Sequence, residues 1–184
     1  MNVQIGRAGK KRELAVFIQS ILQFSWDDSK KTGSFSGNRE DKDKNITFKL
    51  TEAECGSIIS AIKARHEFSA FHSHENNKTT IKLTPWDKEI KSKGPKGDYS
   101  YTQPAFGLTL VRNGNQTFKV PLECGEARNI AALLEMFLQK LYQERFEARE
   151  AEMRNRQNNN NQNNDNTSNT NSNQGSDSEE EVPF

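Results

Sequence analysis

The chain has 184 residues, of which 32% are hydrophobic and 28% are charged, and its net charge is +1. This length fits one domain plus a tail, and without a run of about 18 apolar residues we expect no transmembrane helix. Five of the 25 acidic residues and none of the 26 basic residues lie in 157–184, so residues 1–156 carry +6 and the remainder −5. A basic body suggests a polyanionic ligand, and the acidic end could compete for the same surface.

The cysteines and the N-terminus bear on the cellular compartment. Cys55 and Cys124 are far apart in the chain, and two unclustered thiols predict neither a disulfide framework nor a zinc site. Residues 1–7 lack the apolar stretch of a secretory signal. We therefore expect a cytoplasmic protein with reduced cysteines, in the host cytoplasm if the protein is viral.

The first half of the chain mixes strands with one helix. Residues 14–26 are rich in β-branched and aromatic side chains, which predicts a long strand with a helix as the alternative. Residues 27–44 are polar and predict a loop with one short strand at 34–36. Residues 45–50 alternate between apolar and polar, which is typical of a half-buried strand.

A helix is predicted directly after that strand. Thr51 is a suitable N-cap, and Glu54 stands three residues later as in a capping box. The apolar side of this helix consists of Ile58, Ile59 and Ile62.

The second half of the chain predicts two hairpins and a long helix. Residues 67–74 and 79–86 should pair around a turn at 75–78. After a lysine- and glycine-rich segment at 87–103, Asn113-Gly114-Asn115 separates two apolar runs and is a strong hairpin signal. The helix should begin at about Glu123 and fray before Arg156. Its apolar stripe is Ile130, Leu133, Leu134, Phe137, Leu138, Leu141 and Tyr142.

A weak internal repeat relates residues 47–56 to residues 117–125, each a predicted strand that runs into a helix. The predicted fold is therefore α+β, with antiparallel sheets from two β-rich units that are each closed by a helix. An OB-fold is the structural alternative. Residues 1–150 should form the domain, residues 151–177 a disordered Asn-rich linker, and residues 178–184 an acidic tail.

The layout resembles the Whirly family of plant single-stranded DNA-binding proteins and the related positive cofactor 4 fold. Three segments carry the resemblance, which covers about residues 45–142: the strand-to-helix run at 48–60, the aromatic strand at 68–73, and residues 118–121 with the helix that follows. The Lys-Gly-Lys-Ala-Ala type motif of that family has only a poor counterpart at residues 9–12, and residues 27–44 offer less strand than the family has. The resemblance implies a single-stranded DNA-binding protein without catalytic activity.

No enzyme constellation, phosphate loop or cofactor motif stands out, so we expect a protein that is not an enzyme and has no cofactor. His72 and His74 lie on one face of a predicted strand beside Glu75, and His66 is close in sequence. A third well-placed metal ligand is missing, so we expect no metal site and interpret these histidines as exposed polar residues or phosphate contacts.

Basic residues interleave with aromatic residues, a pattern typical of single-strand binding, in which rings stack on bases and lysines follow the phosphates. Phe17, Phe48, Phe106, Phe118 and Phe137 are expected in the core instead. The predicted nucleic-acid contacts are Lys10, Lys11, Arg12, Trp26, Lys30, Lys31, Lys82, Trp86, Lys88, Lys91, Lys93, Tyr99 and Tyr101.

The C-terminal residues resemble the terminal peptide of bacterial single-stranded DNA-binding proteins, in which acidic residues precede a Pro-Phe end. Residues 157–174 hold ten asparagines and almost no apolar side chain, which predicts a disordered tether. The Phe184 ring and its carboxylate suit a pocket with a basic rim. The partner-binding residues would be Glu179, Glu180, Glu181, Val182, Pro183 and Phe184.

The sequence thus predicts a sequence-tolerant single-stranded DNA-binding protein that protects single-stranded DNA and recruits replication, recombination or repair proteins through its tail. The alternatives are a transcription regulator or RNA-binding protein of similar fold, and a scaffold that assembles through its long helix. A homo-oligomer, either a dimer or a tetramer, is expected because the helix stripe exceeds the needs of one small sheet. The expected interface residues are Ile130, Leu134, Phe137, Leu138 and Leu141.

Overall fold

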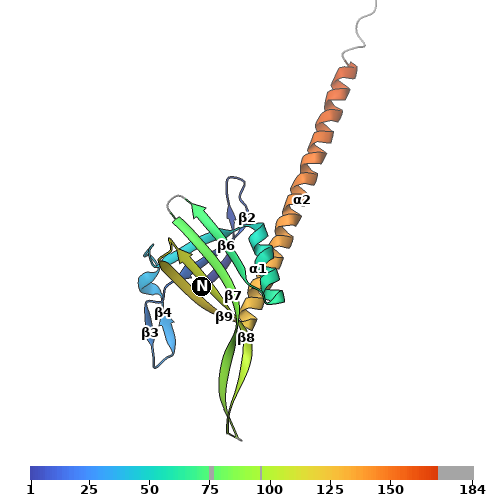
Figure 1. Cartoon of the computed structure of the whole chain (residues 1–184). Helices are drawn as coiled ribbons and strands as arrows, with labels where there is room; N and C mark the ends of the chain where they lie inside the picture. The colour runs from blue at the N-terminus through green and yellow to red at the C-terminus, as the bar shows by residue number, and fades with distance from the viewer. Residues whose placement is uncertain (75–76, 96, 170–184) are drawn as a thin grey trace, which may run out of the picture. The chain divides into compact units, whose positions relative to one another are not determined.

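The computed structural model describes residues 1–74, 77–95 and 97–169, and the chain divides into two units, residues 1–141 and 142–184. The predicted class is confirmed at the level of an α+β fold with antiparallel sheets and two helices (Figure 1). Its elements are β1 (Asn2–Ala8), β2 (Glu13–Ile21), β3 (Ser25–Asp27), β4 (Thr32–Ser34), a 3-10 turn η1 (Ser36–Asn38), β5 (Asn45–Leu50), α1 (Glu52–Ala64), β6 (Phe68–His74), β7 (Asn77–Gly94), β8 (Gly97–Arg112), β9 (Gln116–Glu123) and α2 (Cys124–Asn169).

The first sheet has the order β1-β2-β5. Residues that are paired across strands share a face, so Val3, Ile18 and Phe48 lie together on the side that faces the core. Phe17 was expected in the core, and this is wrong: it pairs with Gln4 and Lys49 on the other side of the sheet. The cause is the alternation of side chains along β2, which places Phe17 opposite its buried neighbours Val16 and Ile18.

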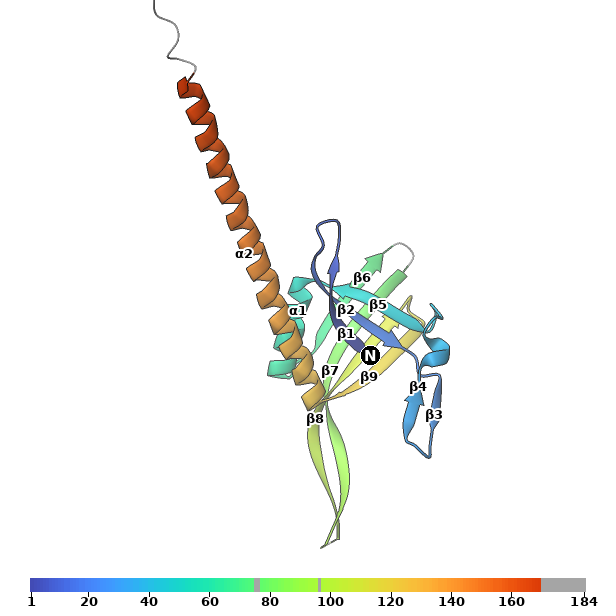
Figure 2. The same cartoon turned by 180° about the vertical axis from the view of Figure 1, so that it is seen from behind.

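The second sheet has the order β6-β7-β8-β9. Its hairpin at 113–115 is as predicted, with positive φ at Asn113 (52°) and Gly114 (76°). The lysine- and glycine-rich segment is not irregular, because β7 and β8 stay paired without interruption from Thr79↔Arg112 to Gly94↔Gly97. Beyond the last pair between β8 and β9, residues 87–94 and 97–104 therefore form a two-stranded ribbon, here called the arm (Figure 2).

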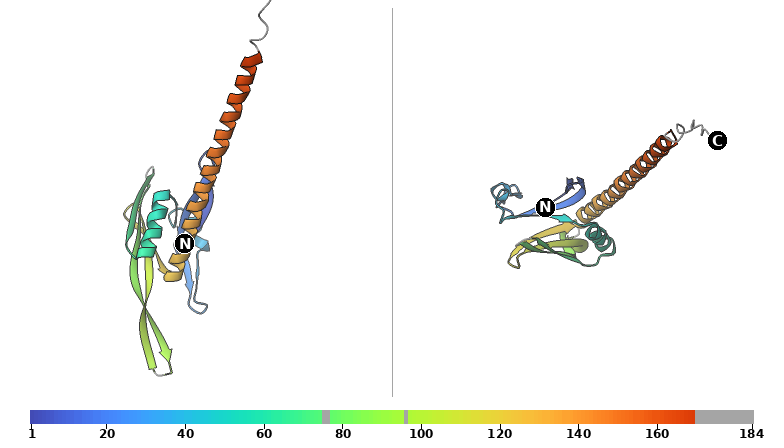
Figure 3. Two further views of the ribbon diagram at one scale, coloured as in Figure 1. Left: turned by 90° about the vertical axis from the view of Figure 1, so that its right-hand side faces the viewer. Right: turned by 90° about the horizontal axis from the view of Figure 1, so that it is seen from above.

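The two sheets form separate layers, with α1 and the first turns of α2 toward one end (Figure 3). Thr51 caps α1 as predicted, because its hydroxyl accepts a bond from the Glu54 N–H (3.2 Å) while the Glu54 carboxylate accepts one from the Thr51 N–H (2.8 Å). The shared core is built from both sheets and both helices. It includes Phe48, Leu50, Cys55, Ile58, Ile62, Ile81, Phe106, Leu110, Phe118, Leu134, Phe137 and Leu141.

The prediction of one strand over 14–26 is wrong at its end. β2 stops at Ile21, and the chain then leaves the first sheet, because the Phe24 N–H donates to the Ser34 carbonyl (2.8 Å) at the start of the small β3-β4 ladder. The short strand expected at 34–36 lies instead at Thr32–Ser34.

The predicted fraying of the long helix is also wrong, since α2 continues to Asn169 and includes the first part of the expected linker. Its charged turns combine good helix formers with ion pairs such as Arg154–Glu150 (3.1 Å), which favour the helix. Asparagine has a low helix propensity, so the local sequence does not account for the continuation of α2 beyond Gln157. Residues 170–184, with the rest of the expected linker and the tail, lie outside the described residues. No helix in the described part of the chain is long and apolar enough to cross a membrane.

Candidate nucleic-acid interface

The register of the second sheet defines the face that points away from the core, here called the outer face. On β7 this face takes the even-numbered residues from Lys78 to Ser92, and on β8 their odd-numbered partners from Val111 to Tyr99. On β6 and β9 it takes Ser69, Phe71, Thr117 and Lys119. Because the pairing has no bulge, the same side of the ladder continues from the sheet onto the arm, where the ribbon twists (Figure 1).

Large aromatic side chains stand exposed along the outer face. The exposed fractions are 61% for Phe71, 41% for Trp86, 54% for Tyr99 and 50% for Tyr101. Between them the face carries small or β-branched residues such as Thr80, Thr84 and Thr109. Isolated exposed apolar residues are ordinary, but a series of rings along one strand pair is a surface suited to flat, apolar ligands.

Charges on the same face are mostly positive. The charged strand residues there are Lys78, Lys82, Lys88, Lys119 and Glu123. Lys82 and Lys119 lie in one row, two strands apart, which separates their backbones by roughly 10 Å. Glu123 is neutralised by Lys88, whose Nζ is 2.5 Å from Oε1 of Glu123. The face therefore attracts anions.

The arm presents two different sides. Tyr99 and Tyr101 stack on the outer-face side, with ring centroids 6.3 Å apart and an interplanar angle of 22°. Ile90 pairs with Tyr101 on that side. The opposite side carries charges of both signs, namely Asp87, Glu89, Lys91, Lys93 and Asp98. By register Lys91 and Lys93 therefore lie on the opposite side of the ladder from the rings that they were expected to accompany, although both line one concavity with Tyr99.

An ion pair fixes the base of the arm. Arg65 ends α1 in the left-handed conformation (φ 53°), and its Nη2 lies 2.9 Å from Oδ1 of Asp87. The same nitrogen donates to the Trp86 carbonyl at 3.3 Å. The backbone of Trp86 is thus tied to the helix at the residue where the arm leaves the sheet.

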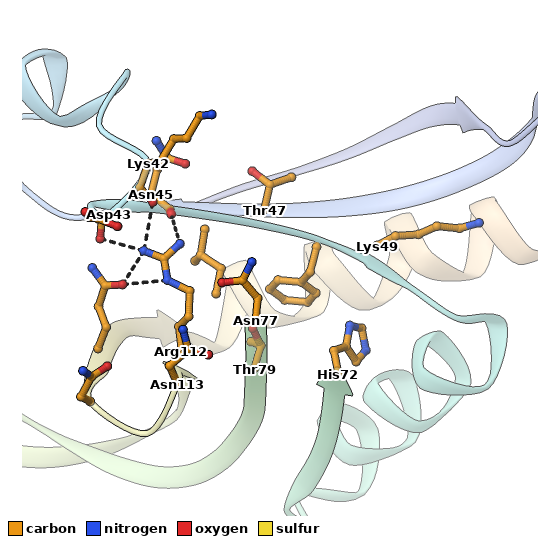
Figure 4. A pocket seen from close by; sticks show the side chains of 14 residues that line it. Lys42, Asp43, Asn45, Thr47, Lys49, His72, Asn77, Thr79, Arg112 and Asn113 are labelled. Atoms are coloured by element: carbon orange, nitrogen blue, oxygen red, sulfur yellow. Dashed lines mark hydrogen bonds between the residues drawn. The ribbon is translucent and has the colours of Figure 1, made fainter. Parts of the chain in front are cut away.

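A polar groove of about 1070 Å³ lies between β5 and one end of the second sheet (Figure 4). Ile46 and Phe48 belong to its lining, together with the amide side chains of Asn45, Asn77, Asn113, Asn115 and Gln116. Arg112 closes the groove on one side, where its guanidinium donates to the carbonyls of Lys42 (3.0 Å), Asp43 (2.9 Å) and Asn45 (3.1 Å). No described carboxylate forms an ion pair with Arg112, so its charge is not neutralised.

The remaining predicted contacts lie on other elements. Lys10, Lys11 and Arg12 are exposed in the β1-β2 turn. Trp26 is exposed on the β3-β4 hairpin, but Lys30 and Lys31 beside it lie 3.9 and 3.6 Å from Asp27 and Asp28. The structure thus gathers Lys82, Trp86, Lys88, Tyr99 and Tyr101 on one face and leaves the other predicted contacts elsewhere.

Sequence reasoning missed Phe71, Lys78 and Lys119 as members of this face. Alternation along their strands would have identified two of them, because Ala70 and Phe118 point inward and their neighbours Phe71 and Lys119 therefore point outward.

The expected oligomer interface needs a correction. Leu134, Phe137 and Leu141 are buried within the chain's own core, and Ile130 and Leu138 pack against it. The reason is that both sheets contribute to this core, so the apolar stripe of α2 packs against residues of two sheets and not of one. The exposed apolar side chains of α2 are instead Met136, Tyr142, Phe146 and Met153.

His66 and His72 have partners within the protein. His72 Nε2 lies 2.7 Å from Oε1 of Glu54, and His66 contacts Ser60 and the Glu67 carbonyl. Burial favours the neutral form of Glu54, but bonds from the Thr51 N–H and His72 outweigh it and hold the pKa of Glu54 below its ordinary 4.5. No cluster of three or more His, Cys, Asp or Glu residues suited to a metal occurs within the described ranges.

Comparisons of the chain with protein-family models, with curated proteins and with solved structures find no significant match.

Proposed function

We propose that the chain binds single-stranded DNA through the outer face of β6–β9 and the adjoining side of the arm. The observation that carries this proposal is that exposed Phe71, Trp86, Tyr99 and Tyr101 lie by strand register on the same side of the β6–β9 ladder as Lys78, Lys82 and Lys119. Bases in a single strand have free π-faces that stack on such rings at roughly 1–3 kcal/mol per base. The lysines neutralise phosphates without regard to sequence.

Sequence tolerance follows from the side chains on this face. Stacking and point charges do not distinguish one base from another, whereas direct readout needs bidentate donors such as Arg, Asn or Gln aimed at base edges. The outer face carries one carboxamide, Gln103 on the arm, and no arginine. A duplex would offer the rings only its terminal base pairs, so single strands are preferred.

The element order is compatible with a Whirly-like fold, because two units follow one another that each consist of strands closed by a helix, β1–β5 with α1 and β6–β9 with α2. The tail would then recruit replication, recombination or repair proteins, with Phe184 as its anchor and Glu179–Glu181 as its charge. Binding and recruitment need no catalytic group.

The test is a fluorescence titration of labelled dT and rU oligomers at two salt concentrations, with a hairpin duplex as control. Tight, salt-sensitive dT binding that exceeds rU binding supports the proposal. Preference for rU would favour the RNA-binding alternative. Absence of binding to either would leave a protein scaffold.

A further inference from the structure

The edge of β5 that faces the groove has unpaired backbone groups. β5 pairs only with β2 among the described strands. The Leu22 N–H donates to the Lys44 carbonyl (2.8 Å) in the same register, so Ile46, Phe48 and Leu50 direct their backbone groups toward β2. Asn45, Thr47 and Lys49 point the other way. Arg112 caps the Asn45 carbonyl, and the N–H and C=O groups of Thr47 and Lys49 remain open to the groove.

Two amide side chains beside the groove use their oxygen atoms within the chain. Asn113 Oδ1 accepts from the Lys78 N–H (2.8 Å), and Gln116 Oε1 accepts from Arg112. Their NH₂ groups are left for a ligand. The lining carries Arg112, Lys42 and Lys49 against the one carboxylate of Asp43, so the groove favours a ligand that is anionic and rich in acceptors. The alternating N–H and C=O groups of β5 match the donor and acceptor edge of a nucleobase, and Phe48 provides an apolar floor.

The groove and the outer face meet at neighbouring residues of β7. Asn77 and Thr79 line the groove, while Lys78 between them lies on the outer face. A strand bound along β7 can therefore turn over this rim. We propose that the groove is a second nucleotide-binding segment of the same site, in which the end of the single strand places its bases against the Thr47–Lys49 edge. This inference rests on the proposed function. It adds base selectivity at one end of an otherwise sequence-tolerant site.

The test uses a double variant, Asn77→Asp with Asn115→Asp, which puts two negative charges at the groove while keeping side-chain shape. The matched control is Asn2→Asp with Asn129→Asp, at exposed positions outside both surfaces. Each protein is titrated with dT oligomers of about 6 and about 24 nucleotides, one near the lower end and one above the upper end of the roughly 4–16 nucleotides that an OB-fold covers. The groove variant should bind the long oligomer roughly tenfold more weakly, because like charges repel. It should bind the short oligomer almost normally, and the control should match the wild type.

Amide spectra of the ¹⁵N-labelled protein locate the contact. The long oligomer should shift the Thr47 and Lys49 N–H signals, and the short one should shift only outer-face signals. If the groove variant binds the long oligomer like the wild type, the groove inference fails while the outer-face proposal stands. If the wild type binds no dT oligomer at low salt, the proposed function itself fails. If an extended acidic peptide shifts these two amides and DNA does not, the groove is a strand-addition site for a protein partner and the inference is overturned.

Discussion

Nε2 of His72 lies 2.7 Å from Oε1 of Glu54, so one carboxylate serves both the N-terminal cap of α1 and the edge strand β6. The His72 ring also meets Phe48 edge-on, with centroids 5.6 Å apart. Glu54 and His72 therefore connect the cap of α1 and the edge strand β6 with Phe48, which lines the groove.

This relationship predicts an acid-dependent loss of stability. Because the folded pKa of Glu54 is lowered, its contribution is present above its unfolded pKa and is lost as the pH falls through the folded value. Glu54→Gln keeps the shape of the cap but removes the charge, and should cost about 1 kcal/mol of unfolding free energy at neutral pH. Urea unfolding at several pH values measures this. The difference from the wild type should shrink as the pH falls below 4.5, the ordinary pKa of a glutamate side chain.

The outer face predicts which aromatic residues matter for binding. Trp86→Ala and Phe71→Ala should each weaken dT binding by about 1–3 kcal/mol, because each removes a stacking ring. Lys82→Ala or Lys119→Ala should lower the salt slope by roughly 0.7 per lost phosphate contact. Trp26→Ala is the matched comparison, since Trp26 is also exposed but its neighbouring lysines lie near carboxylates. A larger effect at Trp26 than at Trp86 would move the site to the β3-β4 hairpin.

Assembly is predicted to depend on the exposed apolar side chains of α2. Tyr142, Phe146 and Met153 are spaced four and seven residues apart, which keeps them near one side of a helix. Light scattering should show a dimer or tetramer, and Phe146→Ser should shift the mass toward the monomer because it removes the most exposed ring of α2. Gln139→Ser serves as the control. A monomeric wild type at micromolar concentration would refute the assembly.

The tail is predicted to recruit partners without contributing to DNA affinity. Deletion of residues 177–184 should leave dT binding intact or slightly tighter, because the removed acidic charge repels phosphate. Phe184→Ala should abolish most recovery of partner proteins, since Phe184 is the only large apolar ring of that segment. Pull-downs from a lysate of the source cell compare the full-length protein with the Phe184→Ala variant. Equal recovery of partner proteins by these two would reduce the tail to a solubility device.

The two cysteines should differ in reactivity. Burial, with the nearby carboxylates of Glu54 and Glu52, raises the pKa of Cys55 to about 12, and the thiolate is the reactive form. Cys124 is partly exposed at the start of α2. A thiol reagent near pH 8 should label Cys124 in the native protein and reach Cys55 only after denaturation, as mass spectrometry would show. Equal labelling rates would mean that the core opens readily around α1.

Local features of the fold were predictable from sequence because their causes lie within a few residues. The alternation of 45–50, the Thr51–Glu54 capping box and the Asn113-Gly114 turn depend on backbone and side-chain interactions between near neighbours. The positions of Lys82, Trp86, Tyr99 and Tyr101 on one face also follow from period-two alternation once strand pairing is known.

The tertiary structure alone decided which side of each element is covered. Phe17 and Phe71 have ordinary core chemistry, yet they face away from the core because the packing partners of their sheets lie on the other side. Leu134 and Leu141 are buried within the chain because two sheets, distant in sequence, enclose one helix face. The groove needs β5 beside the ends of β7 and β8, and Arg112 reaches the Asn45 carbonyl across 67 residues of chain. Such contacts depend on the packing of distant segments, which local sequence patterns do not encode.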